Sequence, residues 1–235
     1  MDNWSLRLFR NDLSKLIEII EREHIAGDFG SLRTVLEALN GKAIIEYELE
    51  GICFHINGRM QGTLPENINY YQIYFDNLLK IKHDLVVNSD PLGCYSLDIL
   101  IDCYANSTTQ TKAYCSSWHL DKHNVNDNTK YTHPIYHFQF GGRKMELITD
   151  EFSVLSSPRI PHPPMDIFLG FHFIISNFFN SRQYPFVNTI FEDYEYQQII
   201  KRAQKRLWNS YFGAFNSSNV HNDFTFKNVF PLYLN

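Results

Sequence analysis

The residues best suited to chemistry gather in residues 115–164, CSSWHLDKHNVNDNTKYTHPIYHFQFGGRKMELITDEFSVLSSPRIPHPP, which hold five of the ten histidines. Side chains alternate between the two faces of a β-strand. If residues 114–123 form a strand, His119, Asp121 and His123 therefore share one face. Imidazole and carboxylate groups at this spacing could bind a metal ion or transfer protons.

A second strand is predicted over residues 133–140, where His133 and His137 share a face. The stretch between the two predicted strands, residues 124–132, is polar and turn-rich, which favours antiparallel pairing. Cross-strand neighbours lie about 4.5–5.5 Å apart at Cβ, so the imidazoles of both strands could converge. The opposite face of the pair would carry aromatic residues for a core.

Neutral imidazoles and a carboxylate are good ligands for a divalent metal such as zinc or manganese. A catalytic metal needs three protein ligands and an open position. The candidate metal ligands are His119, Asp121, His123, His133 and His137. The alternative is a polar cluster without metal, in which these side chains hydrogen-bond to one another and to the backbone.

The same stretch also suits a phosphate or nucleotide site. Histidine can act as general acid and base in phosphoester cleavage, and Gly141-Gly142 would let the backbone approach a phosphate closely. The candidate catalytic residues are His119, His137 and Arg159. The candidate ligand- or partner-binding residues are His123, Arg143, Arg159 and His162. The simpler interpretation is a tight turn at the glycine pair and a structural role for Arg159.

A third interpretation is a binding module without catalysis. The proline-rich residues 157–164 would run extended beside an aromatic-rich sheet and offer a rigid surface to a partner protein. The basic residues at 201–206 could contact nucleic acid, although a solvated helix face explains them more simply. A serine nucleophile is not supported, because the chain has no GxSxG motif.

Composition limits the class of protein. The 235 residues are 44% hydrophobic and 15% aromatic, which predicts a packed core and argues against disorder. The net charge of −5 gives no overall attraction to nucleic acid. The four cysteines form no CxxC pair and the first residues lack the apolar run of a signal peptide, so we expect reduced cysteines and a cytoplasmic protein. The longest apolar run, near residues 167–175, is too short to span a bilayer.

Hydrophobic periodicity predicts the remaining elements. Helices are expected over residues 4–23 and 31–39, and strands over residues 43–50, 52–56 and 95–104, whereas residues 70–85 fit either type. A buried helix should open at Pro163-Pro164, with Asp166 at its N-terminus, and a capping box at Thr189 should start a last helix to about Tyr211.

This order predicts a single α+β domain over residues 1–235. An antiparallel β-meander (residues 43–150) would have a helical N-terminal part (residues 1–40) and C-terminal helices (residues 163–212) packed mainly on one of its faces.

Three segments, WHLDKH, HPIYHFQFGG and SSPRIPHPPMDIFLGFHFIISNFF, resemble signatures of small uncharacterised bacterial families encoded beside phage-defence or other mobile-element genes. The resemblance covers about residues 115–180. It implies a cytoplasmic bacterial protein that works with partner gene products, and no known reaction. The order helix, meander, proline-rich segment and helix also resembles the ubiquitin-conjugating fold, without the cysteine that follows the proline-rich segment there.

The leading hypothesis is therefore a subunit of a bacterial antiviral defence-type assembly, with its histidine-rich sheet face as the ligand or partner site. The alternative is a metal-dependent or histidine-based hydrolase that acts on phosphoesters or nucleotides. A partner protein subunit is expected, a nucleic acid or nucleotide ligand stays open, and no membrane partner is expected.

Overall fold

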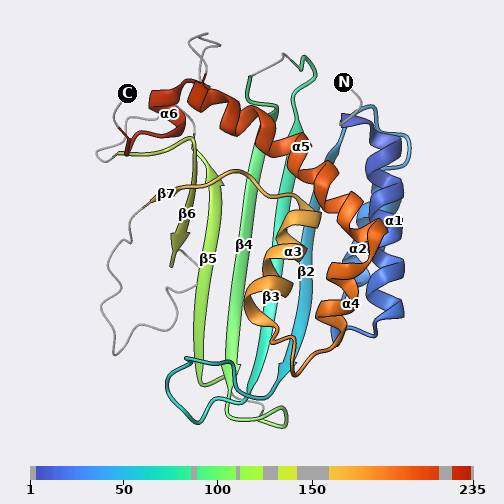
Figure 1. The fold of residues 1–235 in the computed structure, drawn as a ribbon, viewed down its shortest axis with the longest axis vertical. Coiled ribbons are helices and arrows are strands. Elements are labelled where there is room, and N and C mark those ends of the chain that lie inside the picture. Colours follow the sequence, from blue (N-terminus) through green and yellow to red (C-terminus); the bar gives the residue numbers. More distant parts are fainter. Residues whose placement is uncertain are drawn as a thin grey trace.

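The computed structural model describes residues 4–85, 89–109, 112–123, 132–141, 159–216 and 224–233. Within them, seven strands form one sheet whose order follows the chain, and every neighbouring pair is antiparallel (Figure 1). The strands are β1 (Gly27–Asp28), β2 (Glu46–Asn57), β3 (Tyr70–Ile81), β4 (Leu92–Tyr104), β5 (Tyr114–Lys122), β6 (Tyr136–Phe140) and β7 (Ile160–Pro161). The predicted antiparallel meander is confirmed.

The helices of the described residues precede β2 or follow β7 in the chain, which confirms the α+β class. They are α1 (Leu6–Arg22), α2 (Gly30–Ala38), α3 (Ile167–Phe178), α4 (Phe186–Glu192), α5 (Tyr194–Asn216) and α6 (Phe226–Val229). In Figure 1, α3 and α5 cross in front of the sheet, with α1 and α2 at the side of β2. None of these helices is long and apolar enough to cross a membrane.

Alternation in β3 shows why this segment is a strand. Every second residue from Tyr71 to Ile81 is buried and the residues between them are partly exposed, a period of two that no helix produces. The buried set faces the helices: Asn77 Nδ2 donates to the carbonyl of Met165, just before α3. The other set belongs to a face of the sheet that carries none of the described helices.

The starts of α1, α3 and α5 differ from the prediction, and α3 begins at Ile167 rather than at Pro163-Pro164. The hydroxyl of Ser5 caps α1 by accepting from the Leu8 N–H, so this helix begins at Leu6 rather than at the expected residue 4. The expected capping box at Thr189 is wrong, because Thr189 lies inside the short α4. The long helix α5 begins only at Tyr194, where the Asp193 carboxylate accepts from the Tyr196 N–H.

Asp166 organises the start of α3. Its Oδ1 accepts from the N–H groups of Phe168 and Leu169, so the helix begins after the prolines at Ile167. Its Oδ2 accepts from Arg206 Nη2 of α5 at 2.7 Å, and both side chains are almost fully buried. This contact joins the two helices over the sheet and holds the end of the proline-rich segment in place.

Gly170 is where α3 comes closest to the sheet. A Cβ at this position would lie 2.4 Å from Cζ of Phe75, a fully buried ring of β3. Gly170→Ala is therefore expected to destabilise the fold by about 1–3 kcal/mol through overpacking. Gly213→Ala in α5 is the matched control, because nothing lies within 4 Å of its Cβ position. There alanine should stabilise by about 0.5–1 kcal/mol. Urea unfolding followed by circular dichroism measures both changes, and equal shifts would refute the close approach.

Candidate metal centre

The predicted strand pair is present. β5 and β6 are adjacent and antiparallel, with Asp121 opposite His137 and His119 opposite Gln139. Strand β6 starts at Tyr136, so His133 precedes it in the connecting segment. The two strands bring the carboxylate of one strand beside an imidazole of the other.

The faces divide as alternation predicts. Phe138 contacts Phe173 of α3 with ring centroids 5.5 Å apart, which places Phe138 on the helix-bearing face. Its neighbour His137 therefore points to the helix-free face, together with His119 and Asp121. His137 is 4% exposed, whereas the side chain of Asp121 is 44% exposed. The group is thus built into the sheet surface but open to solvent on the Asp121 side.

Three side chains converge closely enough to share an ion. In His119, Asp121 and His137, one potential ligand atom from each residue lies within 4.8 Å of the others. His119 Nε2 is 3.6 Å from Asp121 Oδ2. Two atoms bound to one zinc ion at about 2.0–2.2 Å lie roughly 3.5 Å apart in tetrahedral geometry. Small side-chain rotations would complete the site.

The backbone sets which nitrogen of His119 can act as a ligand. His119 Nδ1 lies 3.1 Å from the carbonyl oxygen of Gly141. A carbonyl can only accept, so Nδ1 carries a proton, and Nε2 is the ring nitrogen that faces Asp121. A second hydrogen bond of this kind is the usual support of a metal-binding histidine. Gly141 adopts a φ of 98°, a left-handed conformation that favours glycine, and its N–H donates to the Ser117 carbonyl.

Burial determines the charge of His137. It lowers the pKa of this imidazole to about 3, with smaller contributions from His133 and His119. His137 is therefore neutral at pH 7, and no group in the described part of the chain hydrogen-bonds to its buried Nδ1. Burial raises the pKa of the Asp121 carboxyl, and His119 opposes that shift. An unpaired imidazole nitrogen and a partly desolvated carboxylate are both groups that a cation would stabilise.

His133 and His123 form a layer beside this group. Their rings lie 3.9 Å apart, and the His133 ring meets the edge of His137 at 4.3 Å. His133 Nδ1–H donates to the Pro134 carbonyl. Neither residue belongs to the described group whose ligand atoms converge, so the predicted set of five narrows to three.

The remaining predicted site residues fall in different places. Arg159 immediately precedes β7 and contributes to the lowered pKa of His137, so it acts on the same group. His162 does not lie with the cluster as expected. Its ring packs on Phe138, on the helix-bearing face, and its Nδ1–H donates to the Pro163 carbonyl. Arg143 lies outside the described residues.

Two residues help to position the site, and the sequence analysis predicted this role for neither of them. Asp98 of β4 is opposite His119 and raises the pKa of Asp121, but only the β4–β5 register reveals this. Gly141 had been considered as a turn or a phosphate contact, whereas the structure uses its carbonyl to orient His119. The sequence signal for Gly141 was a glycine immediately after a predicted strand.

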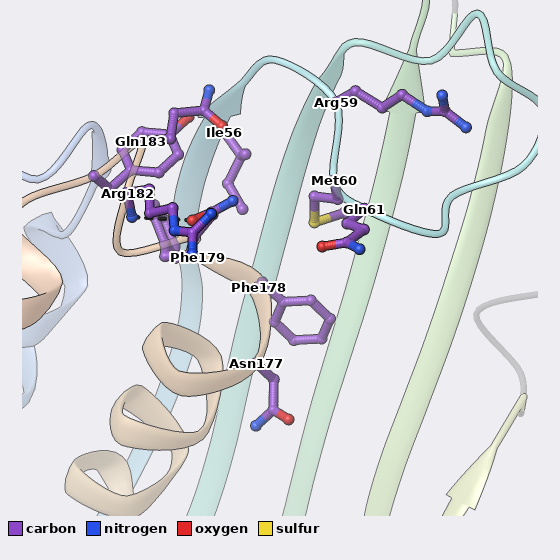
Figure 2. A pocket seen from close by; sticks show the side chains of 11 residues that line it. Ile56, Arg59, Met60, Gln61, Asn177, Phe178, Phe179, Arg182 and Gln183 are labelled. Atoms are coloured by element: carbon purple, nitrogen blue, oxygen red, sulfur yellow. Dashed lines mark hydrogen bonds between the residues drawn. The ribbon is translucent and has the colours of Figure 1, made fainter.

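A separate pocket of about 420 Å³ lies between the end of α3 and the loop after β2 (Figure 2). It is lined by Ile56, Arg59, Met60, Gln61, Asn177, Phe178, Phe179, Asn180, Arg182, Gln183 and Tyr184. None of these lining residues is a histidine, a cysteine or a carboxylate, so the pocket offers no imidazole, thiolate or carboxylate ligand. Among the described residues, the group of histidine and carboxylate side chains that could hold a metal ion lies on the helix-free face of β5 and β6.

Comparison with protein-family models, curated proteins and solved structures finds no match to this chain, so its function has to be argued from the site itself.

Proposed function

We propose that His119, Asp121 and His137 bind one divalent metal ion and that this protein is a metal-dependent hydrolase. The observation that carries the proposal is the convergence of three ligand atoms within 4.8 Å. One of the three residues is a buried histidine, His137, whose Nδ1 has no hydrogen-bond partner among the described residues. A polar cluster without metal accounts for this less well, because it leaves that buried nitrogen unsatisfied.

Three protein ligands leave a coordination position for water, which is the arrangement of catalytic rather than structural zinc sites. A metal ion held there would lower the pKa of its bound water far below that of bulk water, to about 7, and would so supply hydroxide at neutral pH. The exposed side of Asp121 gives solvent and substrate access to that position. Two imidazoles and one carboxylate suit zinc or manganese, and the same set also suits iron(II).

Metal analysis of protein purified without a histidine tag tests the site. We expect about one equivalent of a divalent metal, lost in His119→Ala and His137→Ala with the fold retained by circular dichroism. The matched control is His55→Ala, a histidine of β2 whose partner in β3 is Gln72 and which lies outside the group. Wild-type protein that stays free of metal after incubation with zinc, manganese or iron(II) would refute the proposal.

The hypothesis of a subunit in a bacterial defence-type assembly rests on the sequence resemblance and stays a prediction, as does a partner protein subunit. The two functions are compatible, because a hydrolase subunit can act within an assembly. If no metal binds, the remaining alternative is a hydrolase in which the histidines act without a metal.

A further inference from the structure

Arg159 shares a row of the sheet with the proposed metal ligands. In the β6–β7 register, His137 is opposite Pro161 and Phe138 is opposite Ile160. Continuing that register by one residue sets Arg159 opposite Gln139, which pairs in turn with His119. Residues directly opposite in an antiparallel pair share a face, so Arg159 belongs to the helix-free face, beside His137.

Among the described residues, Arg159 has no carboxylate partner, unlike the two arginines of α5 that form ion pairs with aspartates. Arg202 and Arg206 each bind a buried aspartate, Asp12 and Asp166. Among the described residues, no carboxylate lies within ion-pair distance of Arg159, and its Nε is buried without a hydrogen-bond partner. A desolvated guanidinium donor that is left unsatisfied is costly, which favours a role in holding an anion over the structural role.

We propose that the substrate of the metal site is a phosphoester whose non-bridging oxygens are bound by the Arg159 guanidinium; this inference rests on the proposed function. The planar fork of arginine matches phosphate geometry. One divalent metal, the carboxylates of Asp121 and Asp98, and Arg159 sum to a local charge of about +1 when the imidazoles are neutral, which complements a phosphate group of charge −1 to −2. A neutral ester or amide would leave the guanidinium uncompensated.

A metal ion held by His119, Asp121 and His137 would supply hydroxide from a bound water, with that water's proton released to solvent. The hydroxide oxygen would form a bond to phosphorus as the bond from phosphorus to the leaving oxygen breaks. The leaving oxygen takes a proton from solvent, so one water is consumed and an alcohol and a phosphate are released. Arg159 holds the phosphate oxygens that gain charge in the transition state.

Three substrates with the same leaving group test the assignment: p-nitrophenyl phosphate, bis(p-nitrophenyl) phosphate and p-nitrophenyl acetate. Arg159→Gln should lower kcat/KM for the phosphoesters by about 10²-fold, the scale of removing one transition-state donor. Hydrolysis of the acetate should change less than about twofold, and metal content should not change. Arg159→Lys should be intermediate, because it keeps the charge but loses the fork. Arg33→Gln, an exposed arginine of α2, is the control.

Calorimetric titration with inorganic phosphate separates the two proposals. With metal bound, equal losses on the acetate and the phosphoesters in Arg159→Gln would overturn the role of Arg159 and leave the metal site standing. If no metal binds, the proposed function fails, and titration of the metal-free protein still decides the anion site. A loss of phosphate affinity of about tenfold or more in Arg159→Gln supports that site, whereas no binding by wild-type protein overturns it.

Discussion

Replacement of Arg206 by methionine is expected to lower the free energy of unfolding by about 3–5 kcal/mol, the cost of removing one partner from a buried ion pair. Arg206 Nη2 lies 2.7 Å from Asp166 Oδ2, and the two side chains are 1% and 0% exposed. The guanidinium also lies over the rings of Phe9 and Phe168. Methionine fills the volume, but it leaves the Asp166 carboxylate buried without its cation.

Three further variants, among them the single variant Asp166→Asn, isolate the contribution of the ion pair. Arg33→Met breaks an exposed ion pair with Glu21 and should cost less than about 1 kcal/mol. The double variant Asp166→Asn, Arg206→Met should lose less than the sum of its single variants, because it leaves no uncompensated buried charge. Chemical denaturation gives all four free energies. Additive single changes would show that the two side chains act independently.

The Asp166–Arg206 ion pair also affects the candidate metal centre. Asp166 ends the segment that runs from Arg159 through β7, and its contact with α5 limits where that segment can lie. Loosening the pair should therefore weaken phosphate binding as well as stability, although residue 206 is on the helix-bearing side.

Acid is expected to destabilise the metal-free protein through His137. The pKa of this imidazole is about 3 in the folded chain and about 6.5 when unfolded, so between these values only the unfolded state takes up its proton. Stability from this group is complete above about pH 6.5 and falls as the pH drops toward 3. At pH 4.5 the loss relative to pH 7 amounts to roughly 2–3 kcal/mol.

Denaturant unfolding in the presence of a chelator, at pH 7 and at pH 4.5, isolates this contribution when wild type is compared with His137→Gln. Glutamine does not titrate, so the variant should lose roughly 2–3 kcal/mol less than wild type over that interval. His162 and His172 also have pKa values lowered by burial, but they are present in both proteins and cancel. Equal losses in the two proteins would show that His137 is not held neutral by the fold.

Strand periodicity is local, and for that reason much of the candidate site could be predicted from sequence. His119 and Asp121 are two residues apart, so any strand through them puts both on one face. The polar turn-rich stretch before His133 was sufficient to predict an antiparallel partner, and β5 and β6 are such a pair. The same reasoning predicted the meander, the N-terminal helix and a buried helix, which begins at Ile167 rather than at Pro163-Pro164 as expected.

Residues 70–81 show where local pattern fails. Their tyrosines and leucines fit helical spacing as well as alternation, and the choice follows from pairing with β2 and β4 on both sides. Thr189 carries a capping signature, yet Asp193 provides the cap of the long helix. A capping signature indicates that a helix can begin at a residue, whereas packing against the core decides at which of these residues it does begin.

The sequence by itself determined that His119, Asp121 and His137 could share one face of a strand pair. Only the tertiary structure decided which of the histidines converge. The register sets Asp121 opposite His137, the carbonyl of Gly141 orients His119, and the β6–β7 pairing carries Arg159 to the cluster but His162 to the other side. Register depends on hydrogen bonds between segments distant in the chain, and a shift by one residue exchanges the faces of a strand. The register therefore decides whether these histidines form the proposed metal site or only a row along a strand.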